Sequence, residues 1–293
     1  MTSSTRHTNL FAIVLGFTFL FVIPISRTAN AQVILTVARA VNIRSGPSKT
    51  SKLVGTLTAD QKVVLELPGG QNNFFKVRLD ANTAGWVHGD FLLVPDLESL
   101  APNTEALMVT ATAAAMPACG LLPHYRWRQK TTTSGFTPQP TSASVNAVLQ
   151  WAPLGFGGHA ISTWCKARGG RELKPFSVLG FVRRTRNEVG DGDIHIEITK
   201  TATDAVEDCV VVEIPPANLS PQFASARTDL ASLLSVNSIT NKDFDTPTRV
   251  RFTGLAFWDG WHATSGLPSG HGRCNSSVGA AWELHPVFKV TAP

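Results

Sequence analysis

Several signatures that would assign this sequence to a class are missing. It has no glycine-rich phosphate loop and no Gly-x-Ser-x-Gly turn, so neither a phosphate-loop nucleotide enzyme nor a serine hydrolase is indicated. Charged residues make up only 16% of the chain, and 23 glycines and 18 prolines in 293 residues are too few for a fibrous or disordered polypeptide. Beyond residue 25, no apolar run is long enough to cross a bilayer. We therefore expect a globular protein.

The first 31 residues have the pattern of an export signal. Arg6 precedes an unbroken apolar run from Leu10 to Ile25, and an Ala-Asn-Ala triplet follows at residues 29–31. The run has 16 residues, short of the ~20 that a membrane anchor needs. We predict cleavage after Ala31 and a bacterial protein exported to the periplasm or the extracellular space. Loss of Arg6 and Arg27 lowers the net charge from +5 to +3 on the remaining 262 residues.

All four cysteines lie after residue 118, and they form no metal-binding or redox pattern. Their spacing forms neither a C-x-x-C motif nor a zinc knuckle. An even number of cysteines in an exported protein predicts structural disulfides, here two bonds in one of three pairings. The candidates are Cys119, Cys165, Cys209 and Cys274.

Residues 32–95 are predicted to form a small β-barrel. Between Val33 and Val94 apolar residues recur at every second position in short segments separated by turns. The segment resembles the bacterial SH3 family in the order and spacing of NIRSGPS at 42–48, VG at 54–55, KV at 76–77 and GWV at 85–87. That resemblance implies binding of cell-wall peptidoglycan or wall peptides. The candidate ligand-binding residues are Asn42, Arg44, Phe74, Phe75 and Trp86.

Residues 96–118 form a predicted linker rich in Ala, Thr and Pro, and residues 119–293 form a second β-rich domain. Five β-rich segments and one expected helix, about Pro221 to Leu234, suggest a compact barrel of the OB type or another α+β barrel. The stretch 120–169 is expected to consist of long loops, held by Cys119 and Cys165. The predicted fold class is thus mainly β, with an SH3-like barrel followed by a larger OB-like barrel.

Acidic residues and histidines alternate with apolar residues on two predicted strands. In DIHIEI at 193–198, the polar side chains share one face and the isoleucines the other, and WELH at 282–285 repeats the pattern. Two interpretations are open: a solvated or hydrogen-bonded outer face, or a divalent metal site, calcium or zinc, with a metal-bound water for hydrolysis. The candidate metal or active-site residues are Asp193, His195, Glu197, Glu213, Asp259, His262, Glu283 and His285, and His271 is a further possible donor.

Two resemblances bear on this domain. The series DGDIHIEI, VVVEIP, FWDGWH and WELHPV resembles a domain of exported bacterial proteins with no assigned activity, over residues 175–292. VGDGDI followed by VVVEIPP is also similar to the thermonuclease pattern, which implies an OB fold in which Asp193 and Glu213 bind calcium.

Nucleic acid is not expected as the main partner, except as the substrate of a nuclease. The only local basic cluster is Arg183, Arg184 and Arg186, next to the acidic DGD sequence. The sequence therefore predicts an exported two-domain β protein, without a membrane span after cleavage, that binds cell wall through its first domain. The alternative is a metal-dependent hydrolase, such as a nuclease, in the second domain.

Overall fold

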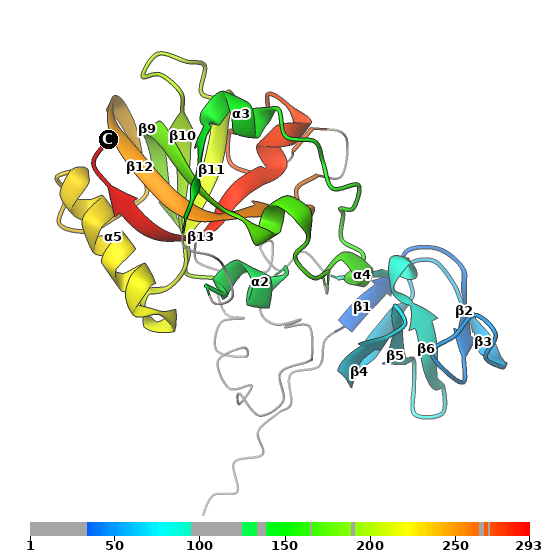
Figure 1. Cartoon of the computed structure of the whole chain (residues 1–293). Coiled ribbons are helices and arrows are strands. Elements are labelled where there is room, and N and C mark those ends of the chain that lie inside the picture. Colours follow the sequence, from blue (N-terminus) through cyan, green and yellow to red (C-terminus); the bar gives the residue numbers. More distant parts are fainter. Residues whose placement is uncertain are drawn as a thin grey trace, which may run out of the picture. The chain divides into compact units, whose positions relative to one another are not determined.

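The computed structural model describes residues 34–94, 125–133, 139–164, 166–188, 191–263, 267–268 and 270–293 (Figure 1). The predicted signal segment, the linker, Cys119 and Cys165 lie outside these residues. Within the described ranges, no helix is both long and apolar enough to span a membrane.

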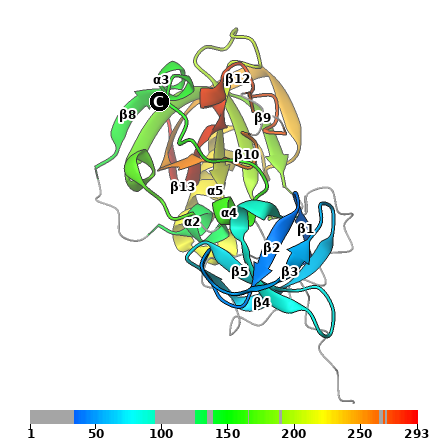
Figure 2. The ribbon, with the colours of Figure 1, turned by 90° about the vertical axis from the view of Figure 1, so that its right-hand side faces the viewer.

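The first domain is a sheet of seven short strands in the order β3-β2-β6-β5-β4-β1-β7 (Figure 2). Alternate residues such as Leu35, Val37 and Val77 are fully buried, as the two-residue period predicts. Gly85 has to be small, because a Cβ atom there would lie 2.6 Å from the carbonyl oxygen of Arg44. The strands are β1 (Ile34–Val37), β2 (Val41–Arg44), β3 (Leu53–Leu57), β4 (Lys62–Gln71), β5 (Phe74–Arg78), β6 (Ala84–His88) and β7 (Leu92–Leu93), with a 3-10 turn η1 (Gly89–Phe91).

The second domain is a closed five-stranded barrel. Neighbouring strands follow the order β9-β10-β11-β13-β12, and β9 pairs with both β10 and β12, which closes the sheet. Only β11 and β13 are parallel within this ring. A helix between the third and fourth strands completes the OB arrangement, so the expected fold class is confirmed. The elements are β9 (Pro175–Asn187), β10 (Ile194–Thr199), β11 (Cys209–Ile214), α5 (Pro221–Leu233), β12 (Lys242–Trp258) and β13 (Trp282–Thr291).

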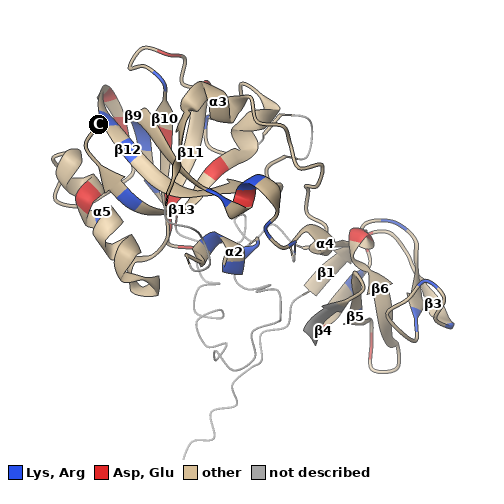
Figure 3. Ribbon diagram, viewed as in Figure 1, with Lys and Arg blue, Asp and Glu red and all other residues tan. Residues whose placement is uncertain are grey.

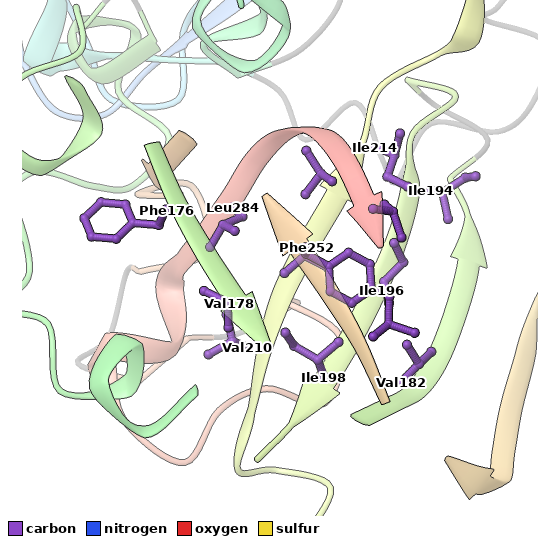
Figure 4. Packing of buried hydrophobic residues seen from close by; sticks show 14 of the residues in the cluster. Phe176, Val178, Val182, Ile194, Ile196, Ile198, Val210, Ile214, Phe252 and Leu284 are labelled. Carbon is purple, nitrogen blue, oxygen red and sulfur yellow. The ribbon is translucent and has the colours of Figure 1, made fainter. Parts of the chain in front are cut away.

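The barrel interior is filled mainly by apolar side chains. Ile194, Ile196 and Ile198 of β10 point into it and meet side chains from every other strand of the ring (Figure 4). Each isoleucine removed from water contributes roughly 1.5–3 kcal/mol of hydrophobic free energy. Helix α5 begins at Pro221, where the Ser220 hydroxyl accepts a hydrogen bond from the Gln222 amide, and its apolar side packs against this core.

The region between residues 120 and 169 contains more regular structure than expected. The sequence predicted long loops and a single helix in the domain, but the described residues include three further short α-helices and a strand parallel to β9. These segments are too short to show a helical or strand period in the sequence. They are α2 (Trp127–Thr131), β8 (Thr141–Ser144), α3 (Val145–Leu149) and α4 (Ile161–Trp164), with 3-10 turns η5 (Gly170–Leu173), η6 (Ala217–Leu219) and η7 (Val278–Ala281) elsewhere.

One disulfide joins Cys209, the first residue of β11, to Cys274 in the long connection between β12 and β13. Both cysteines are fully buried. Of the three possible pairings of the four cysteines, only the one that joins Cys209 to Cys274 agrees with this bond. A bond between Cys119 and Cys165 remains a prediction, because neither residue is described.

Candidate functional site

The alternating acidic residues and histidines lie on the outer face of β10, β11 and β13. His195 on β10 is directly opposite Glu213 on β11, and Val211 two residues earlier is opposite Glu283 on β13. Helix α2, whose basic residues are coloured in Figure 3, places the Lys130 side chain among these carboxylates. The outer faces of these three strands thus carry most of the candidate residues, which together form a polar surface around Val211.

This polar surface is buried, contrary to the interpretation as a solvated face. Seven of the eight candidates are at most 6% exposed, and His262 is half-buried. Residues of α2 and of the β12–β13 connection supply the contacts that cover the strands, such as those of Lys130 and Arg273. Because buried charges are costly without partners, their arrangement needs a specific explanation. The buried candidates are Asp193, His195, Glu197, Glu213, Asp259, Glu283 and His285.

Asp193, Glu213 and His285 form the first group. One ligand atom from each lies within 4.8 Å of the others. His285 Nδ1 is 2.7 Å from Glu213 Oε2, and His285 Nε2 is 3.0 Å from Asp193 Oδ2. The second of these contacts is too poorly aligned for a hydrogen bond, so both oxygens of Asp193 and the Nε2 atom of His285 are buried without a hydrogen-bond partner among the described residues. Two unsatisfied carboxylate oxygens next to an imidazole nitrogen are an arrangement that a cation would satisfy.

Asp259, His271 and Glu283 form the second group, with Lys130 beside it. Again one ligand atom from each residue lies within 4.8 Å of the others. Lys130 Nζ lies 3.2 Å from Asp259 Oδ2 and 3.7 Å from Glu283 Oε1, and it is also 3.7 Å from Glu213. The ammonium group therefore already places a positive charge among these carboxylates.

His195 and Glu197 connect the strands to the β12–β13 connection. His195 Nδ1 is 2.9 Å from Glu213 Oε1, and its buried Nε2 atom is 3.7 Å from Glu197 Oε1. The Glu197 carboxylate accepts hydrogen bonds from the backbone amide of Arg273 at 2.9 Å and from its Nε atom at 2.6 Å. Gly272 packs on the same two side chains with a left-handed φ of 59°, and a Cβ atom there would overlap Glu197.

The excess of carboxylates raises the pKa of the histidines. Burial alone would lower the pKa of His195, but the hydrogen bonds and charges of Glu197 and Glu213 outweigh it and raise the value to about 10. Burial likewise acts to lower the pKa of His285, which neighbouring Asp193 and Glu213 nevertheless raise well above the usual range. Such shifts mark a site that favours positive charge.

The acidic groups respond in two directions. Burial acts to raise the pKa of Glu197, but His195 and Arg273 lower it to about 2. For Asp193, burial and the like charge of Asp191 raise the pKa to about 7. Burial thus makes Asp193 hold its proton more readily than an ordinary aspartate, even though the nearby His285 acts in the opposite direction.

A small polar cavity of about 200 Å³ opens onto this surface. His195 and Glu213 line it, whereas Asp193 and His285 do not. Its other lining residues come from α2, from β9 and β10, and from the β9–β10 and β12–β13 connections. They are Lys130, Arg184, Arg186, Glu188, Asp191, Glu197, Asp259, His262, Gly270, His271 and Gly272. His262 stacks on His271 with ring centroids 5.2 Å apart.

The sequence analysis did not identify Lys130, Arg126 and Glu172, which lie within or beside the site. Lys130 lies in a short segment that no motif singles out, and its spacing from Arg126 is equally typical of a solvated helix face. Arg126 is fully buried and pairs with both carboxylate oxygens of Glu172, at 2.7 and 2.9 Å. Glu172 also accepts the backbone amide of Trp258 at 2.9 Å, which anchors the end of β12 beside the site.

A separate groove of about 530 Å³ lies on the first domain. Asn42 and Arg44 line it, and the Arg44 guanidinium donates a hydrogen bond to the carbonyl oxygen of Ser51 at 2.8 Å. Phe74 also lines it, whereas Phe75 packs in the domain core and Trp86 is half-buried away from the lining. The lining is completed by Ala40, Val41, Lys49, Thr56, His88, Asp90 and Phe91.

Comparison with known proteins identifies the first domain. No curated protein matches the chain. Residues 39–92 match the bacterial SH3 domain family, in agreement with the strand order and groove described above. The segment of the chain from residue 39 to residue 92 is therefore a bacterial SH3 domain.

Proposed function

We propose that this is an exported protein that attaches to the cell wall through its SH3 domain and carries a hydrolytic divalent-metal centre in its OB barrel. The observation that carries the metal centre is Asp193. Both of its carboxylate oxygens are buried and accept no well-aligned hydrogen bond among the described residues, with His285 Nε2 3.0 Å from Oδ2 and Glu213 nearby. An ionised carboxylate in such a place is costly unless a cation neutralises it.

The donor set indicates the class of metal. Two carboxylates and one imidazole suit a borderline ion such as zinc or manganese, whereas calcium prefers oxygen donors alone. Asp193, Glu213 and His285 would hold the ion. His195 and Glu283, each in contact with one of these three residues, would orient them, as groups around metal ligands do in known sites.

The position of the centre is compatible with hydrolysis. The bound ion would lower the pKa of a coordinated water enough to produce a nucleophile near neutral pH. Glu213 both belongs to the proposed ligand set and lines the 200 Å³ cavity, so a substrate in the cavity would lie on that side of the ion. The outer face of the second and third strands is also where OB folds bind oligonucleotides and oligosaccharides.

Calorimetry on the mature chain, residues 32–293, tests the metal centre. We expect binding of zinc or manganese by the wild-type protein and at least about a 100-fold loss of affinity in Asp193→Asn, which keeps the side-chain shape. Asp208→Asn is the matched control, because Asp208 is exposed. Absence of binding by the wild-type protein, or equal binding by Asp193→Asn, would contradict the proposal.

A phosphodiester substrate is the second candidate, because arginines line the cavity next to the carboxylates. Arg184 and Arg186 line the cavity on β9, opposite Glu197 and His195 in the strand register. Guanidinium groups bind phosphate with matched geometry. Metal-stimulated cleavage of DNA or RNA, lost in Asp193→Asn and weakened in Arg186→Gln, would support a nuclease. Cleavage that persists without added metal, or in Asp193→Asn, would count against it.

Wall attachment is supported by the SH3 groove. Arg44 and Lys49 give it positive charge and Phe74 and Phe91 an apolar side, a combination suited to peptides that end in a carboxylate. The mature chain should sediment with purified peptidoglycan, and Arg44→Gln should reduce the bound fraction. Lys52→Gln, an exposed residue outside the groove, is the control. No sedimentation of the wild-type protein would remove the wall-binding part of the proposal.

A further inference from the structure

We infer that the Cys209–Cys274 disulfide is a redox-sensitive clamp that holds residues 270–276 over the candidate metal site, so that the site is complete only in the oxidised protein. This inference rests on the proposed function for its consequence, but its structural part can be tested without any metal.

Residues 270–276 form one wall of the site. Gly270, His271 and Gly272 line the cavity. His271 Nε2 is 3.1 Å from Glu283 Oε2, and His271 Nδ1 is 2.9 Å from the carbonyl oxygen of Ala280. Arg273 donates two hydrogen bonds to the buried Glu197 carboxylate. If this segment moved away, Glu197 would lose both hydrogen bonds from Arg273 and keep only the longer contact with Arg184, and the cavity would lose a wall.

The disulfide is placed to hold this wall. Cys274 directly follows Arg273, and its partner Cys209 begins β11, the strand that also carries Glu213. The backbone amides of Asn275 and Ser276 add only long hydrogen bonds, 3.3 Å each, to the carbonyl oxygen of Glu207. Among the described residues, the disulfide is therefore the only covalent link between this wall and the barrel strands apart from the chain itself, and it joins residues 65 positions apart.

Chemically, the clamp opens by thiol–disulfide exchange. A dithiol gives up two electrons and two protons, the Cys209–Cys274 bond breaks into two thiols, and the dithiol becomes its own disulfide. Both sulfur-bearing residues are fully buried, so exchange requires local opening of the segment. The state of the clamp is accordingly set where the chain folds. In a reducing cytoplasm the wall would stay unclamped, and it would close after transfer to an oxidising compartment.

Hydrogen exchange of the mature chain tests the clamp directly. In Cys209→Ser/Cys274→Ser, amides of residues 270–276 should exchange at least about tenfold faster than in the wild type, while β9 to β13 keep their protection. The matched control, Cys119→Ser/Cys165→Ser, should leave residues 270–276 unchanged. Exchange as slow in the 209/274 variant as in the wild type would overturn the inference.

Two further measurements cover other outcomes. If the 209/274 variant does not fold, the same peptides are followed in folded wild-type protein treated with a phosphine reductant. Loss of protection throughout the barrel, rather than first in residues 270–276, would then overturn the local clamp. Zinc affinity should fall at least about tenfold in the 209/274 variant. If neither protein binds zinc, the proposed function fails, and the exchange data alone decide the clamp.

Discussion

The two β-domains place their polar side chains in opposite environments. In the SH3 domain, the charged and amide groups of interest lie along an open groove, and the Glu66–Lys76 ion pair is largely accessible to water. In the barrel, seven of the eight candidate residues are buried, and residues of α2 and of the β12–β13 connection contact them. Two similar alternating patterns in the sequence therefore lead to very different surroundings.

The difference separates a surface suited to binding from a site suited to chemistry. Exposed charges are screened and contribute little to stability, so those of the SH3 groove are free to serve a ligand. Buried charges interact strongly and shift one another's pKa values, as His195, Glu197 and Asp193 do. Burying these charged groups together lowers the stability of the fold, and such a cost is typical of a functional site.

The largest expected effect concerns the buried ion pair beside the site. Glu172→Gln should lower the free energy of unfolding of the barrel by about 3–5 kcal/mol, because Arg126 is left buried with an uncompensated charge. Urea denaturation followed by barrel tryptophan fluorescence measures this. Glu207→Gln, an exposed site in the same domain, is the control. A loss below about 1 kcal/mol would mean that the barrel tolerates buried charge as well as the SH3 domain tolerates exposed charge.

The pH dependence should be next in size and should differ between the domains. The pKa of His195 is raised from 6.5 to about 10 in the metal-free fold, so its stabilisation is fully present below pH 6.5 and is lost as the pH rises through 10. The pKa of Glu197 is lowered from 4.5 to about 2, so its stabilisation is present above pH 4.5 and is lost as the pH falls toward 2. Thermal unfolding from pH 2 to 10 should therefore reveal losses at both ends for the barrel.

Bound metal should alter the alkaline side of that profile. A histidine that binds an ion is neutral, so saturation with zinc should remove part of the stability loss between pH 7 and 10. At a free zinc concentration 100 times the Kd, the ion should also add about 2.7 kcal/mol. An alkaline profile identical with and without zinc would indicate that the histidines serve only as buried cations.

A smaller effect is expected for the residue that connects the clamp to the strands. Arg273→Gln should cost about 1.5–3 kcal/mol, because the buried Glu197 carboxylate loses a charged hydrogen-bond donor. Chemical denaturation measures the loss. Arg128→Gln on α2 is the control, because it is exposed and removes the same charge. Equal stability of the two variants would show that residues 270–276 contribute nothing to the polar surface.

The smallest effect is expected in the SH3 domain. Glu66→Gln removes the exposed pairs with Lys76 and Arg78 and should change the free energy of unfolding by only about 0.2–1 kcal/mol. Peptidoglycan sedimentation should stay as in the wild type, because Glu66 does not line the groove. If Glu66→Gln lowered the free energy of unfolding as much as Glu172→Gln does, the difference between exposed and buried ion pairs in the two domains would be wrong.

Much of the fold could be predicted because its determinants are local. The alternation in DIHIEI predicts a strand with two unlike faces, and β10 has both. The one helix expected in this domain, from about Pro221 to Leu234, is found as α5. The strand order was not predictable, since pairing β9 with both β10 and β12 depends on contacts far apart in sequence.

The burial of the site could not be predicted for the same reason. The period of β10 shows that His195 and Glu197 share a face, but what covers that face is decided by Lys130 and Arg273, both distant in sequence. The convergence of Asp193, Glu213 and His285 likewise depends on the lateral pairing of β10, β11 and β13. The candidate residues could therefore be named from the sequence, while their role as one charged cluster could not.

The most direct test of the metal centre is anomalous diffraction from crystals of the mature chain grown with zinc. If the metal centre exists, we expect a strong anomalous peak about 2.0–2.2 Å from a carboxylate oxygen of Asp193, a carboxylate oxygen of Glu213 and a ring nitrogen of His285. The peak should be absent in Asp193→Asn crystals. A map with no peak among these three residues, or with zinc only on other histidines, would show that the proposed metal centre is wrong.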